Sequence, residues 1–243
     1  MSTVAVIYRS QQPDTRPPAY EAEIMRRLDA AVRVHQPGAE IVAVLRERRP
    51  HVPASWRIVL RSYDPRGHYH DQYARTVDGL ACATGATAYI VDHDSLYVPE
   101  HFAASEIPAG EFGFNPDYVS LTRRGWFERR NEAGVFAMRG PRELLLEHYT
   151  AARACLDAGN ICVWDEPGFA RYDTPQRKPV WFRQVCSGVN YFHTAILNVD
   201  LRDGANITGD YQAPSYRESF EPYGDWREMW RSLKREDFEC GKS

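Results

Sequence analysis

Residues 71–102 read DQYARTVDGLACATGATAYIVDHDSLYVPEHF, a segment that contains both a helix-to-strand pattern and an acidic cluster. The pattern predicts a helix that stops by Gly85, a short buried strand over 86–91 and then the acidic cluster Asp92-His93-Asp94. In an α/β sheet, ligands bind outside the carboxyl ends of the strands. Two carboxylates one residue apart can point the same way and share one hard divalent cation. The sequence therefore predicts a cation-binding turn at the end of this strand.

The acidic cluster also has a plainer interpretation. Asp92, Asp94 and Ser95 are all good capping residues, so a surface turn or the N-terminus of a helix would account for them equally. Their position directly after an apolar strand, ahead of a segment that begins at Pro99, favours the cation site.

Strand-like and helix-like segments alternate ahead of this stretch. Residues 3–8, TVAVIY, are almost continuously apolar and predict a strand that is buried on both faces at the centre of a sheet. A helix over 20–34 and strands over 39–45 and 56–60 follow, and Asp71 is expected to cap the next helix. This order predicts the α/β class, with a mostly parallel central sheet flanked by helices.

Polar residues follow two of these predicted strands. Tyr8, Arg9 and Ser10 end the first strand and are candidates to hold a nucleotide, although Arg9 is equally well explained as a solvated loop cation. After the third strand, Asp64 is a candidate acceptor for hydrogen bonds from a ribose or base, and Arg66 is a candidate to bind a phosphate.

The segment 89–94, Tyr-Ile-Val-Asp-His-Asp, followed by Val-Pro-Glu-His-Phe over 98–102, resembles the Asp-x-Asp (DXD) segment of GT-A-fold glycosyltransferases. In that family the two aspartates hold Mn²⁺ or Mg²⁺, and the metal holds the diphosphate of a nucleotide-sugar. The resemblance implies that Asp92 and Asp94 are metal ligands. It also implies a third ligand from a histidine near the C-terminus, for which His193 is the candidate; a hydrogen-bonded core histidine is the alternative.

The same resemblance implies further site residues. His93, together with Arg75 and Asp78 of the preceding helix, would line the donor pocket, whereas exposed helix charges are the plainer interpretation of the last two. If the transfer inverts the sugar, Asp165 or Glu166 would be the general base that removes the proton of the acceptor hydroxyl.

The second half of the chain predicts an acceptor-binding half over 103–243 that completes one domain with the nucleotide-sugar half over 1–102. We expect a turn at 112–116, strands at 118–122, 135–138, 160–164 and 188–198, a loop at 125–134, and helices from 141 and over 225–233. Trp126 with its neighbouring arginines is a candidate clamp for an acceptor, and a packed core aromatic is the alternative.

Composition limits the class of protein. With 43% hydrophobic and 26% charged residues, the 243-residue chain is typical of soluble globular proteins, and its net charge of −3 gives no overall attraction to nucleic acid. Five cysteines without a Cys-x-x-Cys pair favour a reduced environment. We see no signal peptide and no membrane span, so we expect a cytoplasmic protein.

The preferred hypothesis is a metal-dependent, hexosyltransferase-like enzyme that uses a UDP- or GDP-sugar. A nucleotidyltransferase or a metal-dependent phosphohydrolase could use the same aspartates, although the Gly-rich loop typical of the former is absent after the first strand. A non-catalytic binding module is the third possibility. The acceptor stays open between a small molecule, a glycan and a hydroxymethylated DNA base, as does the choice between inversion and retention.

Overall fold

The structure is a computed structural model that describes residues 4–10, 18–103, 107–108, 110–115, 118–122, 125–129, 138–164, 171–181, 188–194, 196–199 and 218–233. Asp165 and Glu166, the two candidate bases, lie outside these ranges.

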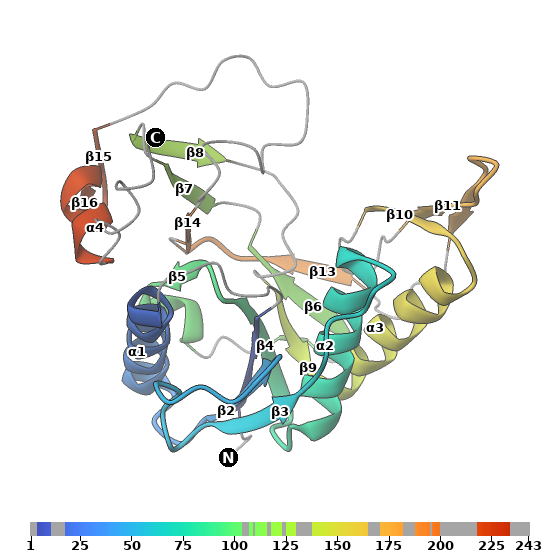
Figure 1. Ribbon diagram of the computed structural model, residues 1–243, viewed down its shortest axis with the longest axis horizontal. Coiled ribbons are helices and arrows are strands. Elements are labelled where there is room, and N and C mark those ends of the chain that lie inside the picture. The colour runs from blue at the N-terminus through green and yellow to red at the C-terminus, as the bar shows by residue number, and fades with distance from the viewer. Residues whose placement is uncertain are drawn as a thin grey trace.

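A seven-stranded sheet forms the centre of the molecule, in the order β13-β6-β9-β4-β1-β2-β3 (Figure 1). Its strands are β1 (Val4–Arg9), β2 (Glu40–Leu45), β3 (Arg57–Leu60), β4 (Thr87–Asp92), β6 (Glu111–Phe114), β9 (Met138–Pro141) and β13 (Gly188–Tyr191). Only β9 runs against the others, pairing antiparallel with both β4 and β6. Every residue of β1 is buried, as its apolar sequence predicts. The predicted α/β class with a mostly parallel sheet is confirmed.

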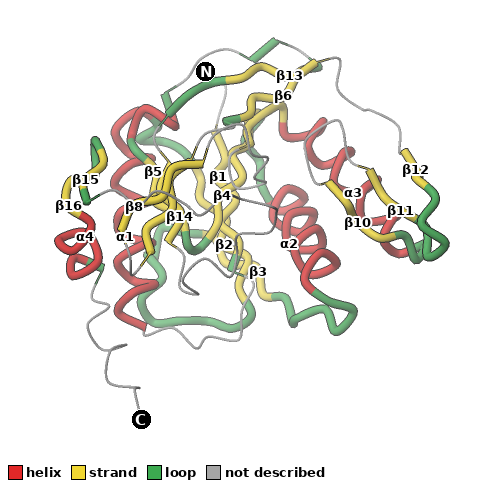
Figure 2. The backbone as a smooth tube through the Cα atoms, turned by 90° about the horizontal axis from the view of Figure 1, so that it is seen from above, coloured by secondary structure: helices red, strands yellow, loops and turns green. Residues whose placement is uncertain are grey.

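Helices cover both faces of this sheet. Figure 2 shows α1 (Pro18–His35) on one face and α2 (His68–Cys82) with α3 (Arg142–Asp157) on the other. Each has an apolar stripe at helical spacing, which α1 buries through Tyr20, Ile24, Met25, Leu28, Ala31 and Val32. Helix α2 approaches the sheet closely at Gly79, where an added Cβ would lie 2.4 Å from Cγ2 of Ile7. Glycine is therefore required for this packing.

Smaller sheets lie beside the central one. One has the order β5-β14-β7-β8 and consists of β5 (Ser95–Tyr97), β14 (Ile196–Val199), β7 (Tyr118–Thr122) and β8 (Gly125–Arg129). The others are β10 (Ile161–Trp164), β11 (Arg171–Asp173) and β12 (Pro179–Trp181), and β15 (Ser219–Phe220) with β16 (Gly224–Asp225). The short helices are η1 (Pro99–Phe102) and α4 (Trp226–Ser232).

Trp126 of β8 connects the four-stranded sheet to the two-stranded sheet of β15 and β16. Its ring is fully buried against Phe220 and Tyr223, and its indole nitrogen donates a hydrogen bond of 2.8 Å to the carbonyl of Gly224. A ring without exposed surface cannot stack on an acceptor, so the packed-aromatic interpretation holds for Trp126.

Three predictions in the second half were wrong. The expected turn at 112–116 is largely strand β6, whose Gly113 does not mark a turn but makes room for the side chain of Arg139. The expected loop at 125–134 begins with β8, which pairs antiparallel with β7 despite its charged residues. The single strand expected over 188–198 is two strands, β13 and β14, that belong to different sheets.

Most of the other expected helices and strands are confirmed. The first-half strands and helices, the helix after Pro141 and the C-terminal helix are all present. Helix α2, however, begins at His68 after Gly67, so Asp71 lies in its first turn and does not cap it. No helix in the described ranges has the length and apolar character to cross a membrane. The division into donor and acceptor halves stays a prediction.

Candidate active site

The carboxyl ends of β1 and β4 lie side by side. The two strands are parallel, with Arg9 in register with Asp92. From β1 the chain passes through α1 to β2 and β3 on one side of the sheet, and α2 then returns it to β4 on the other side of β1. Strand order thus reverses between β1 and β4, and such a switch point leaves a crevice in which ligands bind in open α/β sheets.

A buried ion pair occupies this switch point. The guanidinium of Arg9, which has no exposed surface, donates from Nε to Oδ1 of Asp92 at 2.9 Å, and its Nη2 lies 2.7 Å from the same oxygen. Its Nη1 donates to the hydroxyl of Thr76 at 2.9 Å, which links the pair to α2. The Asp92 side chain keeps 13% of its surface exposed. Arg9 is therefore not the solvated loop cation of the alternative interpretation.

Two opposing effects set the pKa of Arg9. Burial acts to lower the pKa, while the neighbouring carboxylate of Asp92 raises it, and the net result is a raised pKa. The carboxylate of Asp92 thus stabilises the charged form of Arg9 and supplies its counter-charge.

The turn after β4 is fixed through its backbone. The N–H of His93 donates to the carbonyl of Arg9 at 3.2 Å, and the N–H of Asp92 donates to the hydroxyl of Tyr97 at 3.2 Å. Burial, reinforced by Asp92 and Asp94, raises the pKa of Tyr97 well above its usual value. His93 is buried, and Asp94 is half-buried. The turn therefore holds the two aspartates in a defined position at the rim of the sheet.

The helix-capping interpretation of the aspartates is wrong. After the turn at His93 and Asp94 the chain enters strand β5, and the next helical turn, η1, begins only at Pro99. Its N-cap is Val98, without a side-chain capping bond.

Tyr8 and Ser10, predicted to contact a nucleotide, are the sequence neighbours of Arg9 at the carboxyl end of β1. Tyr8 is fully buried and packs on Trp56 with a ring-centroid distance of 5.5 Å, and Ser10 is 1% exposed. Both side chains lie inside the fold in this structure, and their contact with a ligand stays a prediction.

The other predicted donor contacts already have partners. Arg66 holds Asp64 through Nε at 2.9 Å and Nη2 at 2.8 Å, and this hydrogen bonding is the main cause that lowers the pKa of Asp64 to about 2. Arg75, fully buried, donates from Nε to Oδ2 of Asp71 at 2.7 Å. Asp78 pairs with Arg61. These partners give the residues structural roles, while donor binding by Asp64, Arg75 and Asp78 stays a prediction.

In the part of the chain that the structure describes, His193 is not grouped with Asp92 and Asp94 in a set of side chains that could hold a metal ion. Its side chain is exposed in the connection from β13 to β14, so the core-histidine alternative is wrong. The neighbouring Thr194 is anchored, since its carbonyl accepts a hydrogen bond from Asn115 at 2.8 Å and its hydroxyl lies 2.9 Å from Nδ1 of His101.

A three-ligand metal site is not formed. Within the described ranges no three or more His, Cys, Asp or Glu side chains are grouped so that they could hold a metal ion, so His193 does not join Asp92 and Asp94. Two carboxylates nevertheless suit Mg²⁺ or Mn²⁺, which commonly bind to one or two protein carboxylates together with substrate phosphates and water. Because Arg9 compensates the charge of Asp92, we expect weak metal binding until a diphosphate adds its own oxygens.

Comparisons with known proteins give only distant likenesses. No family model matches the chain, and no curated protein matches it. Among solved structures it is similar to a nucleotidyl transferase from Methanothermobacter, at 14% identity and a TM-score of 0.39, covering 65% of this chain and 83% of that one. It is also similar to HddC from Yersinia pseudotuberculosis, at 10% identity and a TM-score of 0.38, covering 60% and 80%. Likenesses at this level identify neither an activity nor a substrate.

Sequence reasoning missed the pairing of Arg9 with Asp92. A partial signal was present, because both residues end apolar strands of a predicted parallel sheet. The pairing also requires that the two strands be neighbours in register, which the structure shows and the sequence analysis did not predict. The buried Arg139, whose guanidinium carbon lies 4.1 Å from the centroid of the Phe192 ring, gave no such signal, because its environment depends on strands remote in sequence.

Proposed function

We propose that the protein is a glycosyltransferase that moves a sugar from a nucleoside diphosphate to an acceptor hydroxyl with the help of Mn²⁺ or Mg²⁺. One observation carries this proposal: the turn with Asp92 and Asp94 stands at the carboxyl end of β4, at the point where strand order reverses. The resemblance of that segment to the DXD motif supplies the chemistry.

Each residue has a defined part in the proposal. The metal, when bound, neutralises charge on the leaving nucleoside diphosphate. Asp94 and Asp92 hold it, and Arg9 fixes the orientation of Asp92 in advance, so that the carboxylate loses little freedom on binding. Asp165 or Glu166 accepts the proton of the acceptor hydroxyl if the transfer inverts. His193 has no part in the metal site proposed here.

Isothermal titration with UDP and GDP, in the presence and absence of Mn²⁺, tests the binding half of the proposal. We expect diphosphate binding that depends on Mn²⁺ and that weakens by about tenfold or more in Asp94→Ala, since one of two protein ligands is lost. Glu147→Ala, which removes an exposed carboxylate on α3, is the matched control and should bind like the wild type. Absence of diphosphate binding in both conditions would refute the transferase and favour a non-catalytic module.

Product analysis tests the reaction itself. A panel of UDP- and GDP-sugars is incubated with Mn²⁺ and with small-molecule, glycan and hydroxymethylated-DNA acceptors, and released UDP or GDP is measured. A parallel assay supplies nucleoside triphosphates with sugar 1-phosphates and measures pyrophosphate. Release of nucleoside diphosphate supports sugar transfer, whereas release of pyrophosphate alone would replace it with nucleotidyl transfer.

A further inference from the structure

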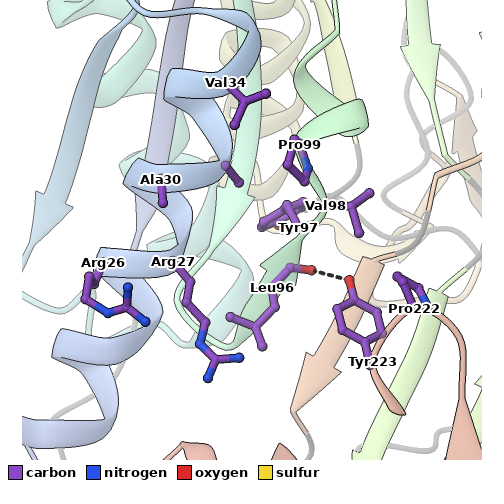
Figure 3. A pocket seen from close by; sticks show the side chains of 11 residues that line it. Arg26, Arg27, Ala30, Val34, Leu96, Tyr97, Val98, Pro99, Pro222 and Tyr223 are labelled. Carbon is purple, nitrogen blue, oxygen red and sulfur yellow. Dashed lines mark hydrogen bonds between the residues drawn. The ribbon is translucent and has the colours of Figure 1, made fainter.

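A groove of about 400 Å³ lies between α1 and the segment that follows the turn with Asp92 and Asp94 (Figure 3). One wall is α1, and the facing wall is the segment 96–99 together with Pro222 and Tyr223. The lining residues are Arg26, Arg27, Ala30, Ala31, Val34, Leu96, Tyr97, Val98, Pro99, Pro222 and Tyr223. The volume lies within the range of about 300–1,000 Å³ that is typical of small-molecule sites.

The sequence of α1 explains why the groove is open and apolar. Arg27, Ala30, Ala31 and Val34 recur at spacings of three and four residues, so they lie along one flank of the helix. The two alanines are too short to fill the space between α1 and the facing wall. Val34, at the end of this flank, is 61% exposed. A ligand that covered these side chains would gain about 25 cal/mol for each Å² of apolar surface removed from water.

Positive charge gathers at the other end of the groove. Glu23 accepts hydrogen bonds from Nη2 of Arg26 and from Nε of Arg27, both at 2.7 Å to the same oxygen. The bonds from Arg26 are the largest cause that lowers the pKa of Glu23 to about 2, so the carboxylate is ionised at neutral pH. Two guanidinium groups thus share one carboxylate, which leaves one positive charge in excess. None of the lining residues is acidic.

The two arginines differ in freedom. Arg27 is also tied to α4, since its Nη2 donates to the hydroxyl of Ser232 at 3.0 Å and its Nη1 lies 3.3 Å from the sulfur of Met229. The side chain of Arg26 is 66% exposed and, among the residues that the structure describes, bonds only to Glu23 of the same helix. Arg26 is therefore the residue that can turn toward an anion with little loss of structure.

We propose that this groove binds a small amphipathic anion. Its apolar chain or ring lies along Ala30, Ala31 and Val34, and its carboxylate or phosphate pairs with Arg26 and Arg27. The excess positive charge at one end and the uncovered apolar wall at the other select this class over cations and neutral polar molecules. Neither Asp92 nor Asp94 lines the groove, so its occupation can be tested separately from the transferase proposal, although the lining residue Tyr97 accepts a hydrogen bond from the backbone N–H of Asp92.

Titration by heteronuclear NMR with four eight-carbon probes tests the site: octanoate, octyl phosphate, octanol and octylamine. We expect both anions to shift resonances of α1 and of residues 96–99, and octylamine to bind about tenfold more weakly or not at all. The ratio of octanoate to octyl phosphate affinity shows which head group the arginines prefer. Equal binding of octylamine and octanoate would overturn the proposal.

Three variants locate the binding. Ala30→Trp fills the groove from an exposed helix position and should reduce octanoate affinity by about tenfold, while Arg26→Gln should reduce it by about fivefold. Val34→Asp, at an exposed site, places a carboxylate in the apolar half and should weaken binding as well. Ala154→Trp on the exposed side of α3 is the control and should leave the affinity unchanged.

Two further results would refute the anion site in the groove, and a third separates it from the transferase proposal. Octanoate binding that persists in Ala30→Trp would place the ligand elsewhere and refute the groove. A dimer in sedimentation that Ala30→Trp dissociates, without anion binding, would make the groove a contact between two copies instead. Octanoate binding in Asp94→Ala should equal that of the wild type, so failure of the transferase proposal and failure of this site are distinguishable.

Discussion

Arg9 and Arg75 are both buried in ion pairs, and the two pairs differ in how far they are exposed to solvent. Arg75 and Asp71 are one helical turn apart in α2, and neither side chain has any exposed surface. Arg9 and Asp92 are 83 residues apart and come from β1 and β4. Arg9 is equally buried, but 13% of the Asp92 side chain is exposed. The first pair is closed to solvent, and the second is open at its acidic end.

This difference separates a structural carboxylate from a candidate functional one. Asp71 accepts hydrogen bonds from Arg75 and, at 3.0 Å, from the backbone N–H of Asp64, so it fastens the loop after β3 to α2. Asp92 accepts a hydrogen bond from the buried Arg9 and ends a strand at the switch point. An open pair can present its carboxylate to a ligand while the buried cation holds it in place.

Breaking the closed pair should have the largest effect on stability. Asp71→Ala leaves the guanidinium of Arg75 buried without its counter-charge, and we expect a loss of about 3–5 kcal/mol in the free energy of unfolding. Urea unfolding followed by circular dichroism measures the loss. The double variant Asp71→Ala/Arg75→Met removes both charges and should recover a large part of it. A loss below about 1 kcal/mol in Asp71→Ala would show that the pair is not closed.

The open pair should give a smaller and asymmetric effect. Asp92→Ala leaves Arg9 buried and unpaired, and we expect a loss of about 3 kcal/mol, at the low end of the range for buried pairs. Arg9→Met should cost less, because Asp92 at the rim can be hydrated. Asp94→Ala removes a half-buried carboxylate from the turn after β4 and should cost less than Asp92→Ala, because the buried Arg9 keeps its counter-charge.

This contrast matters for any binding experiment on the crevice. Loss of diphosphate binding in Asp92→Ala would mix lost ligation with lost folding, whereas Asp94→Ala leaves the buried Arg9 paired and therefore reports ligation more directly. Thermal unfolding of the three variants checks the order. Equal losses in Asp92→Ala and Asp94→Ala would show that Arg9 does not distinguish the two aspartates.

The sequence predicts the strands and helices that carry these ion pairs, but it does not predict which residues pair with each other. Apolar runs such as 3–8 and 86–91 define the parallel strands, because burial on both faces requires continuous apolar residues. The position of Asp92 at a strand end follows from the same pattern. The partners of Arg9 and Arg75 do not follow from local pattern alone, since each depends on strand register or on where a helix begins. Asp71 illustrates the point: it has the residue type of a cap, but α2 starts three residues earlier.

The second half of the chain was less predictable for a related reason. Strands β6, β9 and β13 are four residues each and join the central sheet from distant positions, so their short sequences carry little periodicity. Gly113 and the charges of 125–129 suggested turn and loop, and pairing with partners remote in sequence overrode both.

A third pair, between Arg66 and Asp64, extends the comparison to the most open case and should give the smallest effect. Arg66 is 46% exposed at its side chain, so we expect Asp64→Asn to cost about 1 kcal/mol or less at neutral pH. The pKa of Asp64 is lowered to about 2 from an ordinary 3.8, so this contribution is present above about pH 4 and is lost as pH falls through the folded value. Unfolding of both proteins from pH 6 to pH 2 should therefore show a stability difference that narrows toward acid. A difference that stayed constant over that range would mean that the ionised carboxylate contributes nothing, because only its charge, and not its shape, changes with pH.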